Sequence, residues 1–62
     1  MVKAENEDIV GRMQQATLLL IENLGMYSKS IGSYVPGLSQ GLLKSNIGLQ
    51  ISALTELYEE LN

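Results

Sequence analysis

Apolar and small residues recur every three or four positions through the first half of the chain, which is the spacing of one face of an α-helix. Polar and charged residues such as Arg12, Glu22 and Asn23 fall broadly on the other side. The spacing keeps its phase across Gly25, so we predict one unbroken helix over about residues 6–34, with Asn6 as its N-cap. The predicted stripe consists of Ile9, Met13, Ala16, Leu20, Leu24, Tyr27, Ile31 and Tyr34.

The second half of the chain is apolar on two sides of a predicted helix over about residues 39–61. Leu42, Leu49 and Ala53 form one strip. The other strip consists of Leu43, Ile47, Leu54, Leu57 and Leu61, widened by Ile51 and Tyr58. A helix with two apolar sides needs two neighbours. The first helix can be one of them, and we expect the other to come from another chain.

A turn is predicted between the two helices, at about residues 35–38. Pro36 is the only proline, and it disfavours the helical conformation at the residue before it. Gly37 can adopt a positive φ without steric cost. The pattern therefore predicts an all-α fold: a single domain over residues 1–62, built as an antiparallel two-helix hairpin that dimerises into a four-helix bundle.

Small residues recur on both predicted helices, and two interpretations of them stay open. If the helices run antiparallel about Pro36 and Gly37, residues whose numbers add up to 73 lie at the same level. Gly25 then meets Gly48, and Gly32 meets Gly41. In one interpretation these glycines allow the helices to approach closely. In the other they form a solvated face of small polar residues.

Length and composition favour a partner over a cofactor. A chain of 62 residues buries little apolar surface, and chains of this size usually need a disulfide, a metal or a second subunit. The sequence has no cysteine and no histidine, which removes disulfides and the commonest zinc ligands. No catalytic constellation accompanies its serines. We therefore expect no cofactor and no enzymatic activity, and a homo-oligomer, with a dimer as first choice.

Charge excludes other partners and suggests an orientation for a dimer. A net charge of −3 with four basic residues argues against nucleic acid. The acidic start does not resemble a secretory signal, so we expect a cytoplasmic protein. In the hairpin, the end with both termini holds six carboxylates and two cations, a net charge of −4, whereas the turn half holds two lysines and one glutamate, a net charge of +1. Two hairpins packed head to tail would place unlike ends together.

Three functional hypotheses follow from this pattern. The first is a self-associating interaction or assembly module; the second is a small regulator that docks into a groove of a larger protein; the third is an amphipathic peptide on a membrane surface, which the acidic balance disfavours. Leu19 and Met26 share a polar neighbourhood and form a candidate exposed partner patch. The candidate packing or oligomer residues are Ile9, Met13, Leu20, Leu24, Ile31, Ile47, Leu54, Leu57 and Leu61.

Overall fold

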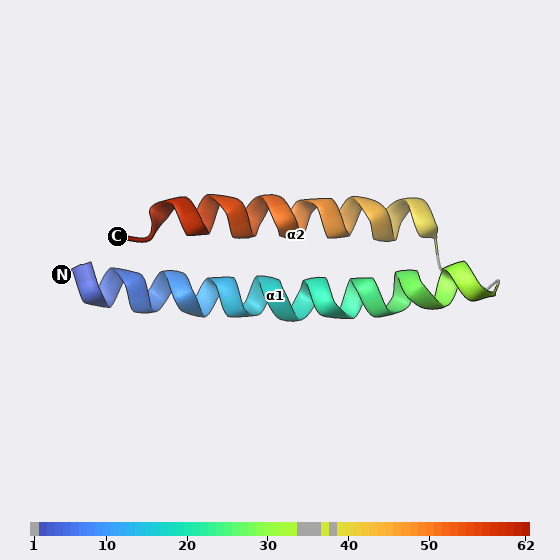
Figure 1. Cartoon of the computed structure of the whole chain (residues 1–62), viewed down its shortest axis with the longest axis horizontal. Coiled ribbons are helices and arrows are strands. Elements are labelled where there is room, and N and C mark those ends of the chain that lie inside the picture. Colours follow the sequence, from blue (N-terminus) through green and yellow to red (C-terminus); the bar gives the residue numbers. More distant parts are fainter. Residues whose placement is uncertain (1, 34–36, 38) are drawn as a thin grey trace.

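A computed structural model shows two antiparallel helices that pack side by side as a thin rod (Figure 1). It describes residues 2–33, 37 and 39–62, with the backbone alone for residues 2–5. Helix α1 spans Val2–Gly32 and helix α2 spans Gln40–Glu60. The predicted all-α hairpin is thereby confirmed. The rod measures 49 × 15 × 14 Å, and both ends of the chain lie at the same end of it (Figure 1).

Helix α1 differs from the prediction at its start. Asn6 lies inside the helix and is not its N-cap, because the helix already begins at Val2. The Asn6 amide forms two hydrogen bonds with the backbone of Asn62, at 3.3 and 3.2 Å. The helix continues through Gly25 without a break, as the apolar spacing predicted.

The connection between the helices is described only in part. Gly37 has a φ of +84°, a conformation that glycine adopts without strain. Pro36, Tyr34, Val35 and Leu38 lie outside the described residues.

Helix α2 begins with a hydrogen-bonded cap. The Ser39 hydroxyl accepts a hydrogen bond from the Leu42 backbone N–H at 3.2 Å, which satisfies one of the free amides of the first turn. Next to it, the Gln40 side-chain amide donates to the Ser30 carbonyl at 3.0 Å and ties α2 to the last turns of α1.

Residues of the two helices meet along one line, which we call the seam. In α1 the seam consists of Ile9, Met13, Ala16, Leu20, Asn23, Tyr27 and Ser30, and in α2 and its C-cap of Leu43, Ile47, Gln50, Leu54, Leu57 and Leu61, all buried or half-buried. Asn6, Gly11, Met26, Asn46 and Ala53 are half-buried as well. Steps of four and three alternate along these seam residues. This is the seven-residue repeat of two helices that wind around each other.

The relative register of the helices differs from the one predicted. The hydrogen bonds from Gln40 to Ser30 and between Asn6 and Asn62 join residues whose numbers add up to 70 and 68, not 73. Gly25 and Gly48 are exposed, and a methyl group added at either would meet no atom within 4 Å. Of the two interpretations of the glycines, close packing between the helices is therefore wrong for the single hairpin, and the exposed face agrees with the structure. These glycines lie on its surface.

Candidate functional site

The seam of the hairpin contains amides where apolar residues were expected. Asn23 is only 9% exposed, although the sequence pattern placed it on the polar side. Its side-chain amide donates to the Leu19 carbonyl at 2.7 Å, within its own helix. Gln50 is half-buried in α2, in the gap that the predicted stripe left between Ile47 and Leu54. A constant seven-residue repeat would have found both residues.

Polar residues in the seam leave a leucine and an isoleucine outside it. Leu24 follows Asn23 and is 46% exposed, and Ile31 follows Ser30 and is 67% exposed. The hairpin alone therefore does not bury these two candidate packing residues. Their burial against a partner stays a prediction.

The other candidate residues lie at or near the seam. Ile9 is buried, and the six remaining candidates, Met13, Leu20, Ile47, Leu54, Leu57 and Leu61, are half-buried. Leu19 of the proposed partner patch is exposed, whereas Met26 is half-buried. The two residues therefore do not form an equally exposed pair.

Little of the hairpin is sealed from water. Among the described residues, the only buried apolar side chains are Ile9, Ala16 and Leu43, and each of them keeps 5–8% of its surface exposed. Within the part of the chain that the structure describes, ten large apolar residues are exposed: Val10, Leu18, Leu19, Ile21, Leu24, Ile31, Leu42, Leu49, Ile51 and Tyr58. An exposed apolar surface of this extent is typical of proteins that bind a partner.

The area of the surface supports the same conclusion. The chain exposes 4717 Å², whereas a compact monomer of 6.8 kDa exposes about 3950 Å². The excess of about 760 Å² is close to the roughly 800 Å² that each partner contributes to a standard interface. The radius of gyration of 14.5 Å also exceeds the value of about 10.6 Å for a compact domain of this length.

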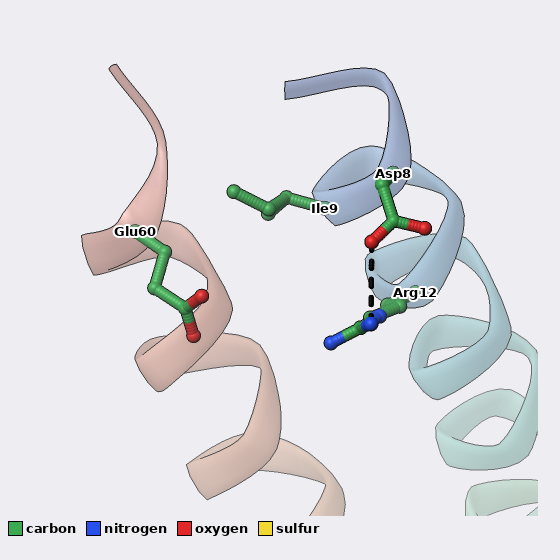
Figure 2. Close-up of a pocket in the computed structure, with 4 residues that line it drawn as sticks. All are labelled: Asp8, Ile9, Arg12 and Glu60. Atoms are coloured by element: carbon green, nitrogen blue, oxygen red, sulfur yellow. Dashed lines mark ion pairs between the residues drawn. The ribbon is translucent and has the colours of Figure 1, made fainter. Parts of the chain in front are cut away.

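A shallow pocket lies at the end of the rod that holds the termini (Figure 2). It is lined by Asp8, Ile9, Arg12 and Glu60. Asp8 and Arg12 form an ion pair at 3.2 Å on consecutive turns of α1, and Ile9 points toward α2 (Figure 2). Both charged side chains are about two-thirds exposed, and such pairs contribute about 0.3–0.5 kcal/mol. The pocket places Arg12 of α1 and Glu60 of α2 on the same face of the hairpin.

Two further kinds of site depend on helix length and residue type, namely a membrane span and a metal centre. Neither α1 nor α2, as far as the structure describes them, has a stretch apolar enough to cross a bilayer. Within the described ranges, no three acidic side chains gather as metal ligands.

Comparison with known proteins adds no family to these observations. No family model, no curated protein and no solved structure matches the chain.

Proposed function

We propose that this chain is a non-catalytic assembly module whose function is to self-associate. Two hairpins pack their exposed apolar sides together and form a four-helix bundle. The observation that supports this proposal most directly concerns two neighbouring residues. Asn23 is buried in the seam, whereas Leu24 beside it is exposed. A chain optimised to fold alone would have the two residue types the other way round.

The surface that the hairpin buries on folding also favours a partner. The hairpin buries about half of the surface of its unfolded chain, compared with about 60% for a typical domain of this size. A second copy would cover the apolar surface that the single hairpin leaves exposed. Burial of an interface of standard size can offset the entropy that association costs.

Sedimentation equilibrium over a dilution series, combined with circular dichroism, tests the proposal. We expect a dimer at micromolar concentration and a loss of helicity as dilution dissociates it. A monomer that stays helical and unfolds cooperatively at every concentration would refute the proposal. A poorly helical monomer that gains helix only with a different protein would instead support the groove-binding regulator.

A further inference from the structure

The residues that flank the seam are not equivalent on its two sides. A residue four positions after Leu20, Tyr27, Ile47 or Leu54 lies beside the seam on one side, because four residues make slightly more than one helical turn. These positions, together with the one four after Asn6, hold large apolar residues, all of them exposed. Thr17, four positions after the seam residue Met13, is exposed and is the polar residue among them. We call the apolar residues the broad face: Val10, Leu24, Ile31, Ile51 and Tyr58.

The pocket at the termini shows which residues share the other side. Arg12 and Glu60 each directly precede a seam residue, Met13 and Leu61, and both line that pocket. Residues one position before the seam in the two antiparallel helices therefore lie on one side of the hairpin. The broad face, with residues from both helices, lies on the opposite side.

Charge distinguishes the broad face from the rest of the rod. Among the described residues on that side, the charged ones are Glu7, one turn before Val10, and Lys44, one turn before Gly48 and two before Ile51. Glu7 lies toward the termini and Lys44 toward the turn. Gly41 and Gly48 lie on the same side, and a methyl group added at Gly48 would meet no atom within 4 Å, so a partner helix can approach there.

We propose that the occupant of the broad face is the same face of a second copy, packed head to tail. This inference rests on the proposed self-association and specifies its interface. The two-fold axis crosses the rod near Thr17, the middle of α1, so that each acidic terminal end lies beside the lysine-bearing turn half of its partner. The alternative arrangement, with both terminal ends together, places like charges side by side. The surface excess of about 760 Å² per copy matches what this single face must bury in a stable dimer.

Matched substitutions of exposed leucines test which face is used. Leu24→Glu places a carboxylate on the broad face twice per dimer, and it should weaken dimerisation by at least about 100-fold. Leu49→Glu makes the same change on α2 away from that face, where Leu49 is 65% exposed, and should change the dimerisation constant by less than about threefold. Helicity at high concentration shows whether each variant still folds. If Leu49→Glu dissociates the dimer and Leu24→Glu does not, the broad face is not the interface.

Distances between spin labels test the orientation. The chain has no cysteine, so Ser33→Cys and Gln15→Cys each provide one label per copy. At 1.5 Å per residue, the head-to-tail dimer offsets the two Ser33 positions by roughly 48 Å along the rod and the two Gln15 positions by about 6 Å along it. Both residues lie away from the broad face, so the separation across the two rods adds to each distance and the comparison between them gives the orientation. A dimer with parallel rods would bring both pairs to the same level.

A short Ser33 distance in a proven dimer would overturn the head-to-tail orientation and leave self-association intact. A monomer at all concentrations would overturn both proposals. A Ser33 distance clearly longer than the Gln15 distance supports the inference, whereas equal distances contradict it.

Discussion

Leu43 and Leu49 provide a direct test of the seam, because they are the same residue type on the same helix with opposite surroundings. Leu43 is 5% exposed and Leu49 is 65% exposed. Replacing a buried leucine with alanine costs about 2–5 kcal/mol in protein interiors. We expect Leu43→Ala to fall at the lower end, about 2–3 kcal/mol, because a rod two helices thick can admit water to the gap.

This loss is large for so small a protein. Total stabilities of about 0.05–0.15 kcal/mol per residue give roughly 3–9 kcal/mol for 62 residues. At about 4–8 °C per kcal/mol, Leu43→Ala should lower Tm by about 10–20 °C. Leu49→Ala removes a side chain of which only about a third is covered, so we expect a loss below about 1 kcal/mol. The change in helix propensity is common to both variants and cancels in the comparison.

Thermal and urea unfolding, followed by circular dichroism at one fixed protein concentration, measures both variants. The concentration must be matched because dissociation of a dimer contributes to the apparent stability. Equal losses for the two variants would refute the assignment of Leu43 to the seam. A larger loss for Leu49→Ala would also contradict the placement of the interface on the broad face.

Three further substitutions test other parts of the fold. Asn23→Leu should stabilise the hairpin by about 1–2 kcal/mol in urea unfolding, because an apolar side chain replaces a buried amide whose hydrogen bond stays within its own helix; destabilisation would show that the amide is needed in place. Ser39→Ala should cost about 1 kcal/mol in the same assay, with Ser45→Ala as an exposed mid-helix control, and no difference between them would argue against the cap at Ser39. Gly37→Ala should lower Tm, since an L-residue at a φ of +84° costs about 1 kcal/mol, and an unchanged Tm would mean that the turn relaxes freely.

The architecture followed from the sequence because helical spacing and one turn signal, Pro36-Gly37, are both local. The boundaries and the register did not. Asn6 looked like an N-cap, yet the helix continues on its N-terminal side. The hydrogen bonds that set the register join the two halves of the chain, which no local pattern relates to each other.

The seam shows most clearly why hydrophobicity alone was not enough. Following apolar residues led from Leu20 to Leu24, whereas two helices wound around each other require the constant repeat that leads to Asn23. The repeat was the better guide because it describes the geometry of the contact. Helical spacing within one chain does not specify which exposed apolar residues a partner covers, because that also depends on the shape and charge of the partner.

The hydrogen bonds of Asn6 and Gln40 have a mechanical consequence. Leucine contacts carry no direction, so sliding one helix along the other by a single turn, about 5.4 Å, would exchange one set of apolar neighbours for a similar set. Hydrogen bonds at 3.0–3.3 Å cannot survive such a slip. The side-chain amides near the two ends of the rod therefore hold the helices in one register. Removing them should first allow the helices to shift along each other, while each helix stays folded.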